Sequence, residues 1–407
     1  MDTTAGRGPV RVGERALAPD LARGFMLLGI VLANTPLLLY GDDSGAPPAP
    51  ADVVAQSVIM TLIDRKAYPM FAFLFGYGMV QLYQRQLDAG SPAVGARRLL
   101  QRRNLCLIGF GLVHAALLWD GDILGSYGLL GLIVVAVFLG RRDRTLLRAA
   151  AVLAVGHVVV LAAAVVVDLV SDGEYGITPA IPYVTDYSGT EQTSYPHSVL
   201  ARSTDWARGL LVYGLTPLVI AAVVLLGCWA ARHRILERPL DHLPLLRRAA
   251  VAGLAVGWAG GAGYALAHFQ VIQVPYAYAW LYEATQATGA LGGLGYVAVF
   301  ALVAARYQLR ERIPGPVAVA VIALGQRSLS GYLAQSVINA PVFAAWGFGI
   351  GAWMTSAPTA LFAVGVWLIT VLLAEVLRQR TVRGPAETLL RRLAYRSPSR
   401  TEVREPR

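Results

Sequence analysis

Long apolar stretches recur along almost the whole 407-residue chain and constrain its fold more than any other feature. About 20 consecutive apolar residues cross the hydrocarbon core of a bilayer, and helices satisfy every backbone amide within the segment itself. Charged residues make up only 15% of the chain, against about 25% in soluble domains. The sequence therefore predicts an all-α, polytopic integral membrane helix bundle of about ten transmembrane helices: 25–40, 68–84, 105–119, 123–140, 149–170, 209–231, 249–270, 284–305, 328–349 and 357–377.

The basic residues fall almost entirely on one side of this predicted topology. With a cytoplasmic N-terminus, 31 of the 35 Lys and Arg residues lie in cytoplasmic segments, and the other four are Arg65, Lys66, Arg202 and Arg208. This asymmetry is the positive-inside pattern. We therefore expect a multi-pass protein of the cell membrane with both termini in the cytoplasm. Contact with anionic membrane lipids then accounts for the net charge of +10, and no nucleic-acid partner is expected.

One membrane domain, residues 25–377, lies between a cytoplasmic N-terminal tail, 1–24, and a basic cytoplasmic C-terminal tail, 378–407. The outer loop 171–208 is long enough to act as a lid or a binding surface. The segment 53–66 is apolar but ends in charged residues, which predicts a short interfacial or re-entrant helix. No metal-ligand cluster is found in the sequence, so we expect no metal and no tightly bound cofactor. A small-molecule substrate is the expected partner, and a homodimer stays open.

Polar residues within predicted spans are costly in lipid, so each is a candidate for function. Asp20 and Arg23 lie one helical turn apart and can pair, although a helix cap with a snorkelling arginine explains them equally well. Asn34 offers either a substrate contact or an ordinary interhelical hydrogen bond. Lys66, the only lysine of the chain, is either an anchor at the interface or a buried cation that meets an anionic substrate.

The segment around His114 is the most suggestive of chemistry. His114 lies about five residues before the outer end of its predicted span, and Asp120 and Asp122 follow in the turn to the next span. A histidine near a carboxylate can act as a general base, and the carboxylate can fix its tautomer. On a continuous helix Asp122 would share a face with His114, but Gly121 is expected to break that helix. A structural histidine within the membrane explains the pattern as well as a catalytic one.

A second polar segment opens the predicted span 328–349. It combines a cation with hydroxyl and amide groups near the cytoplasmic face, which suits a phosphate-bearing ligand. The alternative is ordinary capping and contact between helices. The candidate residues of this segment are Arg327, Ser330, Tyr332 and Gln335.

Taken in order, these motifs resemble the YeiB family of bacterial membrane proteins along nearly the whole chain. The residues that carry the resemblance are Asp20 to Gly24, Asn34, Lys66, Phe73 to Gly76, Arg102, His114, Trp119 to Leu124, Tyr127, Arg327 to Ser336, and Gly384 to Glu387. The opening DLARG is also similar to that of membrane acyltransferases of the heparan-glucosaminide acetyltransferase type. That similarity implies acyl-CoA, such as acetyl-CoA, as a co-substrate from the cytoplasm. Those enzymes carry a reactive histidine after the first span, where 41–52 has none here, so His114 would have to replace it.

Two functions are therefore predicted side by side. In the first, an integral membrane acyltransferase, His114 acts as a base or transient acyl carrier with help from Asp120 or Asp122, while Arg23, Lys66 and Arg327 engage the anionic donor or stabilise the developing oxyanion. In the second, a small-molecule transporter, the same ionisable residues mark a substrate or proton path. A membrane scaffold, the third alternative, predicts that neutral substitutions at His114, Asp122 and Lys66 are silent.

Overall fold

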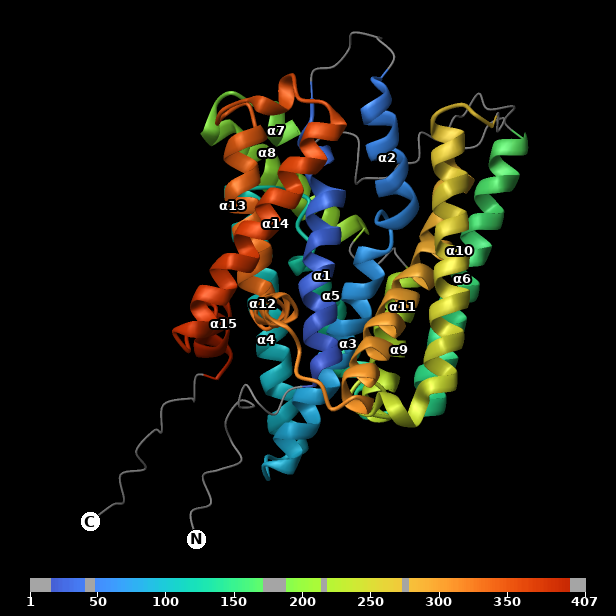
Figure 1. Ribbon diagram of the computed structural model, residues 1–407, viewed down its shortest axis with the longest axis vertical. Coiled ribbons are helices and arrows are strands. Elements are labelled where there is room, and N and C mark those ends of the chain that lie inside the picture. Colours follow the sequence, from blue (N-terminus) through green and yellow to red (C-terminus); the bar gives the residue numbers. More distant parts are fainter. Residues whose placement is uncertain (1–15, 41–47, 171–187, 214–217, 273–277, 396–407) are drawn as a thin grey trace.

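The computed structural model describes residues 16–40, 48–170, 188–213, 218–272 and 278–395. These residues form helices and no strands (Figure 1), which confirms the predicted helical bundle. The α-helices are α1 (Leu17–Asn34), α2 (Pro50–Leu62), α3 (Ala67–Asp88), α4 (Ala93–Leu117), α5 (Leu124–Ile133), α6 (Asp143–Val170), α7 (Ser188–Glu191), α8 (Tyr195–Arg208), α9 (Leu218–Arg232), α10 (Leu243–His268), α11 (Tyr278–Leu309), α12 (Pro316–Gly325), α13 (Ser328–Phe343), α14 (Ser356–Gln379) and α15 (Pro385–Ala394). Short 3-10 or π segments are Thr35–Leu38, Val134–Phe138, Gly209–Tyr213, Pro239–His242 and Ile350–Ala352. Residues 1–15 of the predicted N-terminal tail, 171–187 of outer loop 171–208, and 396–407 of the C-terminal tail lie outside the described residues.

The count of ten spans is not confirmed. Five helices of the described chain are long and apolar enough to cross a bilayer, and a sixth span results if α12 and α13, bent by 88°, are counted together. Several other predicted spans correspond to helices that are too short, or carry too many charged residues, to be counted as membrane-spanning. Two apolar helices, Leu124–Phe138 and Leu218–Arg232, fall below 18 residues, and α4 carries four arginines in its first half.

The first helix lies in the middle of the bundle (Figure 1) and packs against α3, α11, α12, α13 and α14. Its closest neighbour is α12, because glycines let the two backbones touch. A Cβ atom at Gly24 would lie 2.2 Å from the carbonyl oxygen of Val321, and one at Gly325 would lie 1.8 Å from that of Asp20. Small residues at helix crossings allow this approach in membrane proteins. The DLARG motif therefore has a packing role in addition to its charged residues.

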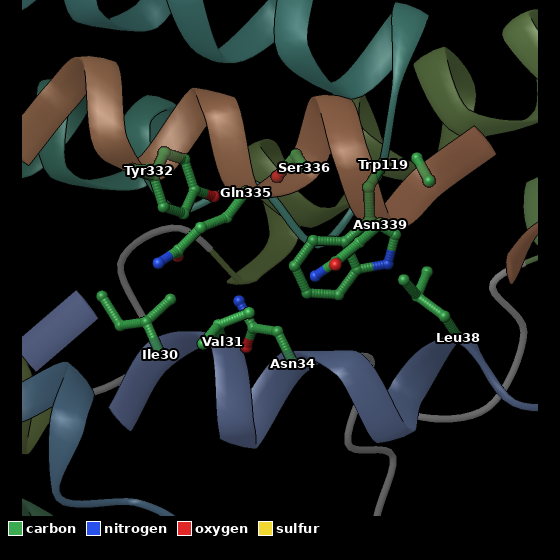
Figure 2. Close-up of a pocket in the computed structure, with 10 residues that line it drawn as sticks. Ile30, Val31, Asn34, Leu38, Trp119, Tyr332, Gln335, Ser336 and Asn339 are labelled. Carbon is green, nitrogen blue, oxygen red and sulfur yellow. The ribbon is translucent and has the colours of Figure 1, made fainter. Parts of the chain in front are cut away.

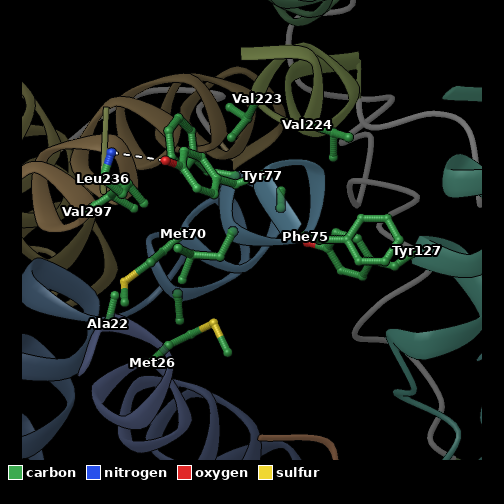
Figure 3. Close-up of a cluster of buried hydrophobic side chains, with 14 of the residues drawn as sticks. Ala22, Met26, Met70, Phe75, Tyr77, Tyr127, Val223, Val224, Leu236 and Val297 are labelled. Carbon is green, nitrogen blue, oxygen red and sulfur yellow. Dashed lines mark hydrogen bonds between the residues drawn. The ribbon is translucent and has the colours of Figure 1, made fainter. Parts of the chain in front are cut away.

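Around this helix the core is a continuous cluster of apolar side chains from helices far apart in the sequence. Figure 3 shows part of it, with Met26, Met70 and Val224 packed together with two tyrosines. The hydroxyl of Tyr77 accepts a hydrogen bond of 3.0 Å from the backbone amide of Leu236 (Figure 3). The buried phenol is thereby satisfied, as a polar group in a dry core must be.

Two helices at one side of the bundle, α6 and α10, differ from the centre (Figure 1). In the most apolar window of α6 only 11% of the residues are buried, and in that of α10 only 22%, against 67% for α1. The exposed side chains of α6 include Val152, Val155 and Val159. An apolar surface of this extent suits contact with lipid tails rather than with water.

The predicted short helix at 53–66 corresponds to α2 and a turn that follows it. The turn at 63–66 separates α2 from α3, and Arg65 within it has φ of 57°. Lys66 closes the turn and is 2% exposed. Its ammonium group donates to the carbonyls of Met60, at 3.2 Å, and Asp64, at 3.0 Å. Lys66 thus satisfies one carbonyl of the last turn of α2, that of Met60, and one carbonyl of the turn that follows.

Candidate functional site

His114 and Asp122 form a buried pair between α4 and α5. The Nδ1 nitrogen of His114 lies 3.0 Å from Oδ1 of Asp122, and both side chains are fully buried. Oδ2 of Asp122 accepts hydrogen bonds from the amide of Gly125, at 2.8 Å, and from the indole of Trp206, at 3.3 Å. Helix α4 ends at Leu117 and α5 begins at Leu124, and the connection between them brings Asp122 beside His114. The structure thus brings together the two residues whose contact the sequence left open.

These hydrogen bonds fix the roles of the two imidazole nitrogens. Asp122 uses its other oxygen for two N–H donors, so Nδ1 of His114 is the nitrogen that carries the proton shared with the carboxylate. The opposite nitrogen, Nε2, is buried and has no hydrogen-bond partner among the described residues. An imidazole held in this way presents a basic lone pair at Nε2.

A glycine makes room for the pair. A Cβ atom at Gly111, one turn before His114 on α4, would lie 2.3 Å from Oδ2 of Asp122. Any larger residue at this position would push the carboxylate away. Gly109, on the same helix, has no atom within 4 Å of such a Cβ. The need for glycine is therefore local to the His114–Asp122 pair.

Asp120 lies apart from this pair and outside the candidate spans. Its Oδ1 atom is buried without a hydrogen-bond partner in the described parts of the chain. Burial is the main cause that raises the pKa of Asp120, to about 7, and nearby Arg202 opposes the rise. No hydrogen bond or ion pair joins Asp120 to His114 in the described structure. The role predicted for Asp120 beside the histidine is left to Asp122.

Helix α8, from the outer loop, covers the pair. Trp206 is the residue of α8 that donates to Asp122. Arg202 is 1% exposed and donates through Nε and Nη2 to the carbonyl of Ala116, at 3.2 Å and 2.9 Å, near the end of α4. Sequence reasoning named this loop as a lid or binding surface, but it did not connect Trp206 or Arg202 to His114. No local signal does so, because the contacts cross more than 80 residues of chain.

A cavity of about 300 Å³ lies between α1, α3, α4, α5, α12 and α13. We call it the arginine cavity, because Arg23, Arg85 and Arg103 line it. Along α1 it extends from Ala16 to Ile30, or about 21 Å of helix rise. The end with the arginines belongs to segments predicted to be cytoplasmic. Other lining residues, at the far end or along the walls, are Asp20, Ile123, Leu124, Tyr127, Tyr332 and Glu387.

The charges of the arginine cavity are only partly neutralised. Arg23 lies 3.3 Å from Asp20, as the sequence predicted, and donates to the carbonyl of Leu74 at 3.3 Å. Arg103 is close enough to Arg23 for their charges to repel. Arg103 forms no hydrogen bond or ion pair with another described residue. The cavity is therefore suited to an anion, and Arg85 and Arg103 are lining cations that the sequence analysis did not single out.

Tyr332 lines the far end of the arginine cavity and also lies beside His114. The centroids of the two rings are 5.1 Å apart. Ile123 and Leu124, which follow Asp122 directly, line the same end. His114 itself is fully buried and does not line the cavity. Tyr332 is thus a lining residue of the cavity and a neighbour of the His114 ring.

A second, much smaller pocket, with a volume of about 20 Å³, lies between the C-terminal end of α1 and α13 (Figure 2). We call it the amide pocket, because Asn34, Gln335 and Asn339 contribute side-chain amides to it. The aromatic residues that line it are Trp119 and Tyr332. Tyr332 is therefore common to the pocket and to the arginine cavity. The predicted site residues Asn34, Tyr332 and Gln335 meet here.

The remaining predicted residues have structural contacts. Arg327, at the bend between α12 and α13, donates to the carbonyls of Val382, at 2.7 Å and 3.2 Å, and Ala323, at 3.0 Å. Glu387 of α15 accepts from the amides of Leu329 and Ser330 and from the Ser330 hydroxyl. Glu387 thereby caps the start of α13. Arg327 and Lys66 do not line the arginine cavity, so their predicted contact with a donor stays a prediction.

The acidic, histidine and cysteine residues of the described chain form no group of three that could hold a metal ion. The His114–Asp122 pair supplies a base, and the arginine cavity supplies positive charge. The amide pocket supplies neutral hydrogen-bonding groups.

Comparison with known proteins confirms the resemblance that the motifs indicated. The family model described as "Protein of unknown function (DUF418)" matches residues 230–397. The chain is 25% identical to the uncharacterized protein YxaH of Bacillus subtilis over 96% of each chain. It is 24% identical to the uncharacterized protein YeiB of Escherichia coli over 94% of this chain and 97% of the relative. No solved structure matches the chain. The similarity to acyltransferases stays a prediction.

Proposed function

We propose that this YeiB-like membrane protein is an acyltransferase, which moves an acyl group from cytoplasmic acyl-CoA to a small-molecule or glycan acceptor at the membrane. One observation carries the proposal: a cavity lined by three arginines at one end reaches Tyr332, the neighbour of the buried His114–Asp122 pair, at the other. A cationic entrance and a basic imidazole at opposite ends are what an anionic thioester donor requires.

The donor would bind with its phosphates among the arginines. Guanidinium groups bind phosphate oxygens through paired hydrogen bonds, and Arg103 has no competing ion pair among the described residues. The pantetheine arm of CoA is narrow and flexible, so it suits a cavity that extends about 21 Å along α1. Its thioester would then lie near Tyr332. The adenine nucleotide would remain at the mouth, near Ala16.

The transfer step uses His114 as a base. A hydroxyl or amine of the acceptor attacks the thioester carbonyl carbon and gives its proton to Nε2 of His114. Asp122 stabilises the imidazolium that forms. The carbon–sulfur bond then breaks, and the imidazolium returns the proton to the CoA thiolate. The products are the acylated acceptor and CoA, and the step requires the Tyr332 ring to turn away from His114.

The test uses the full-length protein in lipid nanodiscs with radiolabelled acetyl-CoA. We expect the wild type to retain labelled acetyl-CoA, and we expect Arg103→Gln to retain about tenfold less. Arg310→Gln is the matched control, since Arg310 is exposed at the end of α11 and does not line the cavity. Absence of acetyl-CoA binding in the wild type would overturn the proposal, as would equal binding by the two variants.

A small-molecule transporter is the second candidate, and one further pair of residues favours it. His157 of α6 and Glu283 of α11 lie in two candidate spans. The Nδ1 nitrogen of His157 is 3.5 Å from Oε2 of Glu283, and its Nε2 is 3.1 Å from the Glu283 carbonyl oxygen. Paired ionisable residues in spans are typical of proton paths. Substrate flux into proteoliposomes without acetyl-CoA, lost in Glu283→Gln, would favour transport over transfer.

A further inference from the structure

The amide pocket indicates the chemical class of the acyl acceptor, an inference that rests on the proposed function. Its side-chain amides come from two helices, Asn34 from α1 and Gln335 and Asn339 from α13, and they point toward the space between the helices (Figure 2). All three side chains belong to buried residues, with exposed fractions of 7%, 3% and 6%. None of the described residues that line the pocket is charged.

Existing hydrogen bonds fix which atom of each α13 amide is left without a partner beside the pocket. The Nε2 group of Gln335 donates to the carbonyl of Leu27 at 3.3 Å, and a carbonyl can only accept. The hydroxyl of Thr35 gives its proton to the carbonyl of Val31 at 2.6 Å, so it accepts from Nδ2 of Asn339 at 3.1 Å. Both amide oxygens, Oε1 of Gln335 and Oδ1 of Asn339, are thereby left buried without a hydrogen-bond partner in the described chain.

Asn34 complements these two acceptors. Its Oδ1 atom accepts a hydrogen bond from the hydroxyl of Tyr68, which leaves Nδ2 as a donor. The three amides therefore supply two oxygen acceptors and one NH2 donor group beside a volume of about 20 Å³. A space of this size holds a single water-sized group.

We propose that the amide pocket anchors one hydroxyl group of the acceptor, and that the acceptor is a polyol or sugar with a second hydroxyl available to His114. A hydroxyl both donates and accepts, so it satisfies an amide oxygen and the Asn34 amide together. An ammonium group has donors only and would leave Nδ2 of Asn34 facing a positive charge. A carboxylate has acceptors only and would face the two amide oxygens. Tyr332 lines the pocket and contacts His114, which places the anchor next to the base.

The test compares acceptors that differ by one group at a time. Full-length protein in nanodiscs is supplied with radiolabelled acetyl-CoA and with 1-propanol, 1,2-propanediol, glycerol or 1-amino-2-propanol. We expect labelled ester from 1,2-propanediol and glycerol at about tenfold or more above 1-propanol, since an unpaired buried polar group costs about 1–3 kcal/mol. The amino alcohol should form less ester than the diol.

The matched variant is Asn339→Leu, which keeps the size of the side chain and removes the amide. We expect it to abolish the preference for the diol over 1-propanol while binding of acetyl-CoA is unchanged. Equal labelling of 1-propanol and the diol, or preferential labelling of the amine, would overturn the polyol inference. Retention of acetyl-CoA without transfer to any polyol would also overturn it and would leave the donor site intact. Failure of the wild type to bind acetyl-CoA would instead overturn the proposed function itself.

Discussion

The two spaces that meet at Tyr332 differ in size, charge and polar lining. The arginine cavity measures about 300 Å³ and is lined by three cations. The amide pocket measures about 20 Å³, and none of the residues that line it in the described part of the chain is charged. A large cationic space selects by charge and admits a flexible anion, whereas a small neutral pocket selects by hydrogen-bond pattern. Under the proposed function, the two ends of α1 serve separate parts of one reaction, and this division of roles can be tested from either end.

The largest effect is expected from a substitution of His114, the proposed base, which lies beside Tyr332. His114→Gln keeps a hydrogen-bonding side chain but removes the basic nitrogen. General-base catalysis contributes about 10²–10⁴-fold, so acetyl transfer to glycerol should fall at least about 100-fold. Binding of acetyl-CoA should stay within about twofold of wild type. A transfer rate equal to wild type would show that the pair is structural and that the division of roles is wrong.

Gly111→Ala tests the packing that lets Asp122 lie beside His114, and it leaves both of these side chains unchanged. The new methyl group would meet Oδ2 of Asp122 at 2.3 Å, and overpacking of this kind costs about 1–3 kcal/mol. We expect a lower melting temperature and slower transfer. Gly109→Ala is the control, because it gains the same helix propensity in open space. Identical melting temperatures for the two variants would argue against a close approach of α4 to Asp122.

Arg103→Gln tests whether the arginine cavity recognises phosphate. We expect about tenfold weaker binding of acetyl-CoA, because the variant removes a cation that has no ion pair among the described residues. Binding of S-acetylpantetheine, which carries no phosphate, should not change. Competition against labelled acetyl-CoA measures both ligands. Parallel weakening of both would indicate a damaged cavity rather than a lost phosphate contact.

The smallest expected effect is a change of stability with pH that depends on Asp120. Burial raises its pKa to about 7 in the folded protein, from a usual value near 4. The folded state therefore binds the proton more tightly than the unfolded state. This contribution to stability is complete below about pH 4 and is lost as the pH rises through 7. The melting temperature of the wild type should fall relative to that of Asp120→Asn between pH 5 and 8. A constant difference would mean that Asp120 does not titrate in this range.

Local sequence patterns predicted the helical class, the Asp20–Arg23 pair and the candidates His114 and Asp122. Each of these depends on spacing along one helix or across one turn. The sequence did not predict that Trp206 would hold Asp122 or that Arg103 would line a cavity. Both depend on contacts between distant segments, which hydropathy does not encode. The predicted span 328–349 begins where α13 begins, but the sequence analysis did not predict α12 (Pro316–Gly325) as a helix of the bundle.

The contacts of Arg327 and Glu387 have a consequence for the order in which the protein is made. Helix α13 supplies Tyr332, Gln335 and Asn339, yet its first amides are capped by Glu387, and the bend before it is held through Val382. Both partners follow the last candidate span, Ser356–Gln379. While the ribosome is still synthesising that span, the start of α13 lacks these contacts. Both spaces around Tyr332 are therefore completed only after residue 387 has emerged, so a chain truncated after the last span would insert into the membrane with an unfinished site.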